Sequence, residues 1–418
     1  MDANIKNLIN ECLDCKNPTC VNGCPVNNNI PLFIKLAKNE KYDEALEVIK
    51  LTSTLPSICS LVCPSENQCK GHCIKNKINK PVSINEIEQY ITLKAKETIP
   101  VINKNNKSVA VIGSGPSGLA CAEKLAVLGY EVTIYDSYDE AGGILTYGIP
   151  DFVLSKNVVS KKIDYIKSLG VKFILNTKLE KDIFLKDLTN QYDAIFLGFG
   201  ASVGKRMDAT NNNINGVIDA NDFLEKMYKN NLELFDNVKD CLVIGGGNTA
   251  IDAARVAKRK LNCNVSIVYR RSEKEMPARV DEIKKAKEDN IDFNFLSNPI
   301  AYIGENSVSE VECIKMKLVA VEGQRARPVV IENSNYKIKA DLVVEAISSS
   351  IDTNLTKSLN THPWGGIIVN ENMQTSIDKV FAGGDCVSGP DLVVTAMKDG
   401  IKAAKCINQY LKDKQLWY

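Results

Sequence analysis

Eight of the fourteen cysteines lie within the first 73 residues, in two runs of four. The first run is Cys12, Cys15, Cys20 and Cys24, and the second is Cys59, Cys63, Cys69 and Cys73. Thiolate sulfur binds both iron–sulfur clusters and zinc, so the spacing has to distinguish them. Structural zinc usually takes two close Cys-x2-Cys pairs, and only Cys12 and Cys15 have that spacing. The runs therefore favour iron–sulfur chemistry, with zinc or purely structural cysteines as alternatives.

The first run ends in Cys20-x3-Cys24-Pro25. This ending resembles ferredoxin runs, in which the last cysteine ligates the other of two clusters. The same crossover gives one 4Fe–4S cluster the ligands Cys12, Cys15, Cys20 and Cys73. It gives a second 4Fe–4S cluster Cys24, Cys63 and Cys69, with the fourth ligand open between Cys59 and a group that is not cysteine. The scattered cysteines are predicted to be small buried hydrophobic residues: Cys121, Cys241, Cys263, Cys313, Cys386 and Cys406.

A glycine-rich turn, Gly113-Ser114-Gly115-Pro116-Ser117-Gly118, lies between a strand-like and a helix-like segment. In a dinucleotide-binding turn the first glycine permits the bend, the second admits the pyrophosphate, and the third lets helix and strand pack closely. The N–H groups at the helix start then bind phosphate. Asp136 lies 23 residues after Gly113, at the end of the next strand-like segment, where a carboxylate can bind ribose hydroxyls. These features predict a bound dinucleotide.

The same pattern recurs at Gly245-Gly246-Gly247-Asn248-Thr249-Ala250, with alanine in the third glycine position. The next strand there ends in Tyr269-Arg270-Arg271, with no acid where Asp136 lies in the first unit. Arginines can pair with a 2′-phosphate that an acid would repel, so the second turn is predicted to bind NADPH rather than NADH. Arg279 is close enough in sequence to assist. The alternative is that Arg270 and Arg271 form a solvated surface pair.

The periodicity of apolar residues organises the chain around these motifs. Residues 1–100 are predicted to be a helical domain with its cysteine runs on loops beside a helical pair. Two strand–turn–helix units follow, over 101–200 and 201–349. Segments 311–321 and 336–346 are predicted strands that close the second unit, and 381–411 a strand, a turn and a final helix. The fold class is therefore α/β, with two Rossmann-like dinucleotide-binding domains after a helical N-terminal iron–sulfur domain.

The 418 residues carry a formal net charge of +1, with 44% hydrophobic and 25% charged residues. This balance gives no electrostatic argument for binding nucleic acid or an anionic membrane. The first ten residues lack an apolar signal region, and no apolar run reaches the ~18 residues of a membrane span. We therefore expect a cytoplasmic protein with reduced thiols. The two histidines, His72 and His362, offer little for acid–base catalysis, so bound cofactors are expected to carry the chemistry.

Taken together, these residues resemble the small (beta) subunit family of NADPH-dependent glutamate synthase. Its relatives include the N-terminal half of dihydropyrimidine dehydrogenase and the large subunit of bifurcating ferredoxin:NADP oxidoreductase. The resemblance covers almost the whole chain. The motifs that carry it are both cysteine runs, the second glycine turn, and the segments 141–150, 269–272, 275–278 and 380–385.

The resemblance implies FAD in the first dinucleotide unit, NADPH in the second, and two 4Fe–4S clusters in the N-terminal domain. It also implies that residues 350–418 return to the first unit, so that the second domain is nested within it. Further FAD contacts are expected from Gly142, Gly143, Ile144, Leu145, Gly384, Asp385 and Val393. The resemblance favours Glu88, shortly after segment 81–84, over Cys59 as the fourth ligand of the second cluster. Asp136 replaces a glutamate that is more usual in the family.

These assignments predict an oxidoreductase that passes electrons from NADPH through FAD and two clusters to a partner. The expected partner is a glutamate synthase large subunit, another redox subunit or a ferredoxin-like acceptor. A dihydropyrimidine dehydrogenase subunit and a ferredoxin:NADP oxidoreductase subunit are alternatives. A disulfide reductase would need Cys-x2-Cys beside the flavin, and that spacing occurs only in the cluster region. A zinc-stapled assembly subunit is the non-enzymatic alternative.

Overall fold

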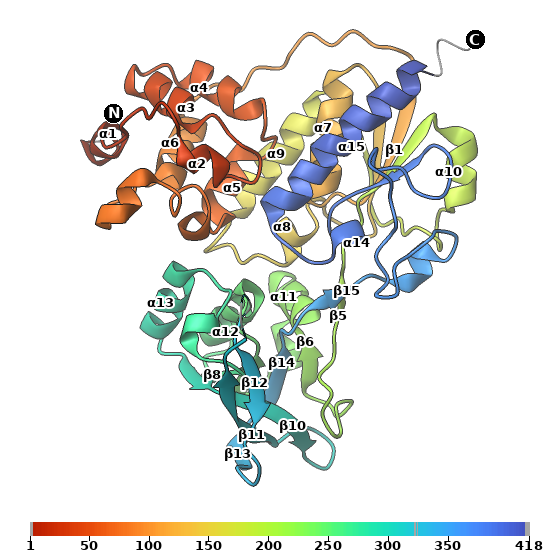
Figure 1. Ribbon diagram of the computed structural model, residues 1–418. Coiled ribbons are helices and arrows are strands. Elements are labelled where there is room, and N and C mark those ends of the chain that lie inside the picture. The colour runs from red at the N-terminus through yellow and green to blue at the C-terminus, as the bar shows by residue number, and fades with distance from the viewer. Residues whose placement is uncertain (1–2, 322, 324, 414–418) are drawn as a thin grey trace. The chain divides into compact units, whose positions relative to one another are not determined.

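The computed structural model describes residues 3–321, 323 and 325–413. The chain divides into two compact units (Figure 1). The first contains residues 1–146, 151–201 and 351–418, and the second contains 202–350 with the short segment Tyr147–Pro150. The chain enters and leaves the second unit through two short antiparallel strands, β5 (Val203–Gly204) and β15 (Ser349–Ser350).

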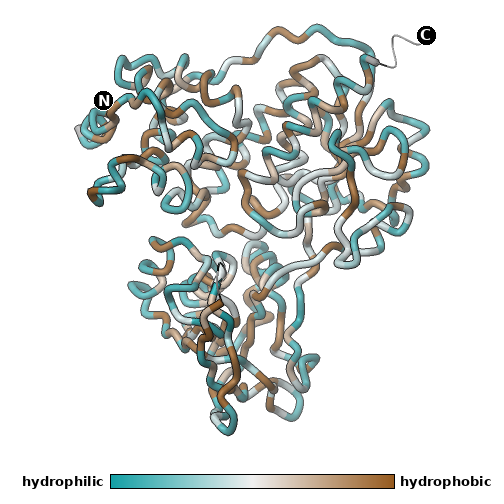
Figure 2. Tube along the Cα trace, in the orientation of Figure 1, coloured by the Kyte–Doolittle hydropathy of each residue, from teal (hydrophilic) through white to brown (hydrophobic). Residues whose placement is uncertain are grey.

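The N-terminal part of the first unit is helical, as predicted. Its elements are α1 (Ala3–Asn10), α2 (Thr19–Asn22), α3 (Ile30–Lys38), α4 (Tyr42–Lys50), α5 (Pro56–Val62), α6 (Ile84–Lys94), η1 (Ser65–Asn67) and η2 (Ile74–Ile78). Phe33, Ile49 and Ile91 are fully buried where α3, α4 and α6 pack. Figure 2 shows hydrophobic and hydrophilic stretches alternating along these helices, as expected where one helix face is buried.

A parallel five-stranded sheet forms the rest of the first unit, in the order β16-β4-β1-β2-β3. Its strands are β1 (Ser108–Ile112), β2 (Glu131–Tyr135), β3 (Lys172–Ile174), β4 (Ala194–Leu197) and β16 (Val380–Ala382). The helical elements are α7 (Pro116–Val127), α8 (Ile144–Tyr147), α9 (Lys156–Ser168), α10 (Leu185–Gln191), η5 (Thr353–Thr356), α14 (Asp385–Ser388) and α15 (Val393–Asp413). Because β16 pairs with β4 and α15 packs on α7, the C-terminal segment does return to the first unit.

The second unit contains a matching parallel sheet, in the order β6-β14-β7-β8-β9. Its strands are β6 (Val217–Asp219), β7 (Asp240–Ile244), β8 (Asn264–Tyr269), β9 (Asp292–Phe295) and β14 (Leu342–Glu345). The helical elements are α11 (Ala220–Tyr228), η3 (Leu232–Phe235), α12 (Asn248–Lys260), η4 (Glu273–Glu275) and α13 (Val280–Glu288). The fold class predicted from the sequence, two nested Rossmann-like domains after a helical domain, is confirmed.

An antiparallel layer covers one face of the second sheet. It consists of β10 (Ser297–Ile303), β11 (Glu310–Val319), β12 (Arg327–Val330) and β13 (Tyr336–Lys339). Val311 and Cys313 of this layer share a buried cluster with Val343. The single strand predicted over 336–346 is therefore two strands, because β13 pairs with β11 whereas β14 joins the parallel sheet. The Asp341 carboxylate, at the break, accepts hydrogen bonds from the N–H groups of Lys239 and Asp240.

Buried charges connect the helical part to the first sheet's helices. The Lys162 ammonium of α9 lies 2.8 Å from the Glu123 carboxylate of α7, with both side chains 4% exposed. Lys162 also lies 3.7 Å from Glu97, which follows α6, and Glu97 lies 3.4 Å from Lys50 of α4. Burial raises the pKa of Glu123, and the Lys162 charge opposes that rise. Breaking such a buried pair leaves an uncompensated charge and costs about 3–5 kcal/mol.

No helix in the described part of the chain has the length and apolar character needed to cross a membrane.

Candidate cofactor sites

The first glycine turn joins β1 to α7. Gly113 has φ +97°, and a Cβ at Gly118 would lie only 1.9 Å from the Gly113 carbonyl oxygen, so both positions require glycine. Gly115 is the N-cap of α7, and a Cβ there would meet no atom within 4 Å. The turn therefore leaves open space beside N–H groups at a helix start, which fits a pyrophosphate.

Asp136 follows β2 and is buried beside this turn. Its Oδ2 accepts hydrogen bonds from the Ser114 N–H (2.6 Å) and the Ser114 hydroxyl (2.5 Å), and its Oδ1 accepts one from the Tyr138 N–H (2.9 Å). The Ser114 hydroxyl oxygen in turn accepts the Gly142 N–H at 2.9 Å. A carboxylate has about four acceptor sites, so Asp136 retains capacity for ribose hydroxyls. Sequence reasoning treated Ser114 only as a turn residue and missed this bridging role.

The predicted flavin loop passes next to the turn. A Cβ at Gly143 would lie 3.1 Å from the Gly115 Cα, and Gly142 and Gly143 both have positive φ, +119° and +54°. Ile144 is 47% exposed, whereas the Leu145 side chain is fully buried. The structure thus brings the two glycines and the exposed Ile144 to the turn, while Leu145 contributes to the protein core.

The C-terminal segment also reaches the start of α7. A Cβ at Gly384 would lie 2.8 Å from the Ser117 hydroxyl oxygen, and one at Gly400 in α15 would lie 2.1 Å from the Ser117 carbonyl oxygen. The Gly384 N–H donates to Asp399 at 3.0 Å. Burial raises the pKa of Asp385 to about 6, a hydrogen bond from the Asp391 N–H opposes the rise, and the charges of Asp391 and Asp399 add to it. Sequence reasoning missed Asp399 and Gly400, which lie within an ordinary amphipathic helix pattern.

Val393, also predicted at the FAD site, is the first residue of α15 and is partly buried. The predicted FAD residues 113–118, 136, 142–144 and 384–385 therefore gather around the start of α7, from four separate segments of the chain.

The second glycine turn joins β7 to α12. A Cβ at Gly245 (φ +146°) would lie 2.3 Å from the Ala346 carbonyl oxygen, whereas one at Gly247 would meet no atom within 4 Å. A Cβ at Gly246 would lie 2.5 Å from the Tyr269 ring. Ala250, in the first turn of α12, is fully buried. Space beside the helix start is again open, here at Gly247, the position that corresponds to Gly115, as a pyrophosphate requires.

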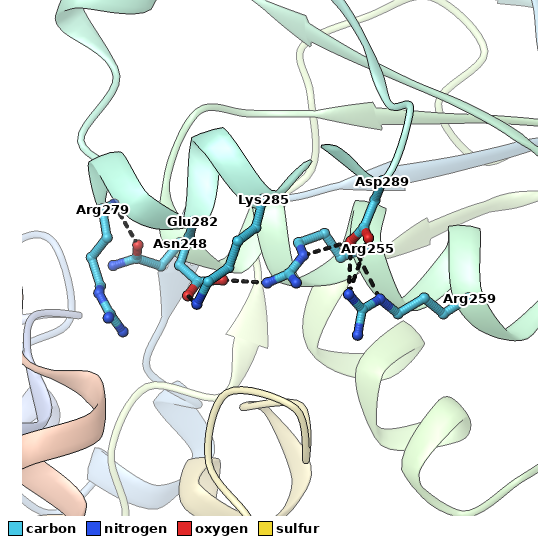
Figure 3. Close-up of polar contacts among 7 residues, drawn as sticks. All are labelled: Asn248, Arg255, Arg259, Arg279, Glu282, Lys285 and Asp289. Carbon is cyan, nitrogen blue, oxygen red and sulfur yellow. Dashed lines mark hydrogen bonds and ion pairs between the residues drawn. The ribbon is translucent and has the colours of Figure 1, made fainter. Parts of the chain in front are cut away.

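The predicted 2′-phosphate residues follow β8. Arg270 is exposed, and the Arg271 Nε donates to the Ala326 carbonyl oxygen at 2.9 Å. The Arg279 N–H donates to the Asn248 side-chain oxygen at 2.9 Å, so Arg279 is held against the start of α12 (Figure 3). The structure therefore brings Arg279 to the glycine turn, holds Arg271 toward the segment before β12, and leaves Arg270 as an exposed cation.

A buried ion network, not anticipated from the sequence, fixes α12 against α13 (Figure 3). Arg255, 3% exposed, contacts the Glu282 carboxylate and lies 2.9 Å from Asp289. Arg259 also pairs with Asp289, at 3.0 Å. The network thus holds together the two helices that begin at the Arg279–Asn248 contact, α12 at Asn248 and α13 at Val280, the residue after Arg279. From the sequence, an arginine on the buried face of a helix could equally extend its long side chain to solvent, so the sequence does not predict the ion pairs.

The first predicted cysteine set lines one pocket. Cys12, Cys15, Cys20 and Cys73 border it, together with apolar residues that include Ile34 and Val82. Burial raises the pKa of Cys20 to about 11, with further contributions from the neighbouring Cys73 and Cys12 thiols. Burial also raises the pKa of Cys12, although a backbone hydrogen bond from Asp14 opposes the rise. Four sulfurs from two distant runs thus meet in one apolar pocket, which fits an iron–sulfur cluster.

The second predicted set also comes together. Burial raises the pKa of Cys69, and the next contributions come from the charges of Glu88, Cys24 and Cys63. Burial likewise raises the pKa of Cys24, with Glu88 and Cys63 among its charged neighbours. Although Glu88 is partly exposed as a residue, burial of its carboxyl group raises its pKa to about 8. The structure places Glu88 among the three thiols, which fits a fourth ligand.

Cys59, the rival fourth ligand, lies within α5 and is 5% exposed. The largest charge effects on Cys24 and Cys69 come instead from Glu88 and Cys63, and for Cys69 also from Cys24. In the described part of the chain, no three or more His, Cys, Asp or Glu side chains are arranged to hold a single metal ion.

The scattered cysteines are mostly interior residues. Cys121, Cys241, Cys263, Cys313 and Cys386 are buried, and Cys406 is partly exposed.

Comparisons with known proteins agree with this organisation. Residues 107–400 match the pyridine nucleotide-disulphide oxidoreductase family, and residues 3–99 match the family of dihydropyrimidine dehydrogenase domain II, 4Fe-4S cluster. The glutamate synthase (NADPH) small chain of Escherichia coli (strain K12) is 36% identical, covering 98% of this chain and 92% of that protein. The NADP(+)-dependent formate dehydrogenase subunit beta of Moorella thermoacetica is 32% identical, covering 94% of this chain and 60% of that protein.

Solved structures show the same fold over 74% of the chain. Mycobacterium tuberculosis FprA in complex with NADPH has a TM-score of 0.63 at 17% identity, covering 74% of this chain and 85% of that chain. The thioredoxin reductase of T. acidophilum has a TM-score of 0.56 at 18% identity, covering 74% of this chain and all of that chain. With its N-terminal 4Fe–4S domain and its nested dinucleotide domains, the chain belongs to the family of the NADPH glutamate synthase small chain and is an NAD(P)H-dependent oxidoreductase.

Proposed function

We propose that this chain takes electrons from NADPH and supplies them, through FAD and two 4Fe–4S clusters, to a separate redox partner. The observation that carries the proposal is the combination, in one chain, of two open glycine turns with two separate groups of candidate cluster ligands. FAD accepts a hydride from NADPH and can return its electrons one at a time, and 4Fe–4S clusters relay single electrons.

The residues of the first unit bind and orient the flavin nucleotide. N–H groups at the start of α7 donate hydrogen bonds to the pyrophosphate beside Gly115, and the Asp136 carboxylate accepts hydrogen bonds from the ribose hydroxyls. Ser114 fixes the Gly142 loop through the hydrogen bond from the Gly142 N–H. Gly384 and Asp385 complete the site at the end of β16.

The residues of the second unit select the nicotinamide nucleotide. The exposed Arg270 and the backbone-held Arg271 supply positive charge after β8, where a 2′-phosphate is expected. Asn248, Thr249 and Ala250 form the first turn of α12, beside the open space at Gly247, and a helix start favours bound phosphate. This arrangement favours NADPH over NADH.

The two ligand sets differ in their surroundings. Cys63, of the second set, caps the C-terminus of α5, and α5 packs on α9 and α15 of the FAD-binding part (Figure 1). The pocket of the first set is bordered by Leu13 and Ile74, which are 64% and 46% exposed. The second set is therefore the inner set and the first set is the outer one.

A glutamate synthase large subunit is the leading partner, because small chains of that enzyme are similar over nearly all of this chain. With it, the complete reaction would form glutamate from glutamine and 2-oxoglutarate. A pyrimidine-reducing partner is the second candidate, supported by the match of residues 3–99 to a dihydropyrimidine dehydrogenase domain.

The test is anaerobic purification followed by cofactor analysis and reduction with NADPH. We expect one FAD and about eight iron atoms with equal sulfide per chain, four for each cluster. NADPH should bleach the flavin absorbance at about 450 nm and generate a cluster EPR signal in a sample with intact clusters. A colourless protein, or one containing zinc and no iron, would refute the proposal.

The fourth ligand of the inner set is tested by two matched variants. Glu88→Ala should change the EPR signal of one cluster or lose about four irons per chain, because it removes a ligand. Cys59→Ser should preserve both clusters, since Cys59 is a buried residue of α5. The opposite pattern would assign Cys59 as the ligand.

A further inference from the structure

The outer cysteine set lies beneath an exposed apolar surface. Leu13 directly follows Cys12, and Ile74 directly follows Cys73, and both residues border the pocket of that set. Ile78, at the end of η2, is 64% exposed. Leu13 and Ile74 border the same pocket, and exposed apolar side chains that lie together mark contact surfaces.

Three exposed lysines lie close in sequence to these residues. Lys16 follows Cys15, Lys77 lies in η2, and the Lys80 N–H donates to the Lys75 carbonyl oxygen, which keeps Lys80 beside the pocket. Among the described residues, no acidic side chain lies within 4.0 Å of these three ammonium groups. We call the surface formed by Leu13, Lys16, Ile74, Lys77, Ile78 and Lys80 the lysine-rimmed face.

The acidic residues near this face are already neutralised. Glu11 pairs with Lys75 at 3.2 Å, and Asp14 lies 3.6 Å from Lys35. The rim therefore carries three uncompensated positive charges on a chain whose formal net charge is only +1. Local charge of this kind steers oppositely charged partners and sets association rates.

We infer that the lysine-rimmed face is the docking surface for the electron-accepting partner, and that this partner presents an acidic surface around its own redox centre. The inference rests on the proposed function and adds the place and the chemistry of recognition. A second copy of this chain is disfavoured, because it would bring lysines against lysines. Each NADPH yields two electrons, NADP⁺ and a proton, so the docked partner is reduced in two one-electron steps.

The test compares two protein acceptors of opposite charge with the holoenzyme. An acidic flavodoxin serves as the matching probe, a basic cytochrome c as the mismatched probe, and menadione as a small neutral acceptor. In the variant Lys16→Glu/Lys77→Glu/Lys80→Glu, kcat/KM for flavodoxin should fall at least about tenfold and that for cytochrome c should rise. Raising the salt from 50 to 300 mM should slow the flavodoxin reaction of the wild-type protein. It should also remove the difference in flavodoxin kcat/KM between the wild-type protein and the triple variant.

The matched control is Lys317→Glu/Lys339→Glu/Lys357→Glu, which changes three exposed lysines far from the cysteine runs in sequence. It should leave both protein acceptors within about twofold of wild type. Menadione reduction and the cluster EPR signals should be equal in all three proteins, which would show that the cofactors are intact.

Equal flavodoxin rates in the two triple variants would overturn the docking assignment while leaving the proposed function standing. Absence of NADPH-dependent menadione reduction in the wild-type protein would instead refute the proposed function. A dimer in solution that Ile78→Asp converts to monomer would assign the face to a second copy and would also overturn the inference.

Discussion

The two glycine turns each join a parallel strand to a helix, but they differ in the residue at the end of the next strand. The strand registers Ile112 with Tyr135 and Ile244 with Val268 place Asp136 and Tyr269 at equivalent positions. In the first unit Asp136 accepts hydrogen bonds from Ser114, whereas in the second the Tyr269 ring lies where a Cβ of Gly246 would be. A buried carboxylate suits ribose hydroxyls, while an aromatic ring followed by exposed Arg270 suits a phosphorylated ribose. The two turns thus differ in charge at the end of the strand that follows them.

The outer strands extend this comparison. In space, β4, β1, β2 and β3 of the first sheet correspond to β14, β7, β8 and β9 of the second. The outer strands differ, because β16 comes late in the chain whereas β6 comes first in its unit. β6 ends at Asp219, the N-cap of α11, whereas β16 ends at Ala382, three residues before Asp385, the first residue of α14. The outer strand position is therefore filled from different parts of the sequence in the two units.

The largest effect is expected at the third glycine position, where the two turns differ in size. Gly118→Ala would place a Cβ 1.9 Å from the Gly113 carbonyl oxygen, so the turn has to distort. We expect a loss of about 3 kcal/mol or more in the free energy of unfolding, and loss of bound FAD. Ala250→Gly, the reverse change in the second turn, should cost only about 1 kcal/mol. Chemical denaturation and FAD content measure both, and equal effects would contradict the comparison.

The next effect concerns the positive charge of Arg270 and Arg271, just after the end of β8. Arg270→Ala with Arg271→Ala should raise the KM for NADPH by about 100-fold, because two charge-assisted hydrogen bonds to the 2′-phosphate are lost. The KM for NADH should change by less than about threefold. Stopped-flow flavin reduction with each nucleotide measures the difference. Equal losses with the two nucleotides would reject a 2′-phosphate role.

A pH effect is expected at Asp385, which follows the outer strand of the first sheet. The folded-state pKa of Asp385 is raised to about 6 by burial, so the flavin-free protein loses stability as the pH rises from about 4 to about 6. Asp385→Asn removes that cost and should stabilise flavin-free protein by about 1–3 kcal/mol at pH 7 but not at pH 4. Thermal unfolding at both pH values is the measurement. Asp219→Asn is the matched control, and since asparagine caps helices as well as aspartate it should change little.

The smallest effect is expected at Ser114. Ser114→Ala leaves the Gly142 N–H without its acceptor and should weaken FAD binding by about 1–2 kcal/mol, or roughly tenfold. Fluorescence titration of flavin-free protein with FAD gives the affinity. Ser168→Ala, at an exposed serine of α9, is the control. An unchanged FAD affinity would mean that the Ser114 bridge does not order the flavin loop.

The sequence by itself determined the two strand–turn–helix units and the helical domain, because glycine spacing and apolar periodicity are local properties of the chain. The chemistry of the cysteine runs was also readable, since thiolate spacing limits what they can bind. By contrast, the sequence could not show that 336–346 splits into β13 and β14, since both halves are equally strand-like.

Only the tertiary structure decided which distant residues meet. It brought the Glu88 carboxyl group near the Cys24 and Cys69 thiols, from a helix that follows both cysteine runs. It also revealed the Ser114–Asp136 bridge and the Arg255 network, which have no local signal. The physical reason is that hydrogen bonds and ion pairs between distant segments depend on how the strands and helices pack, and polar residue types alone do not specify their partners.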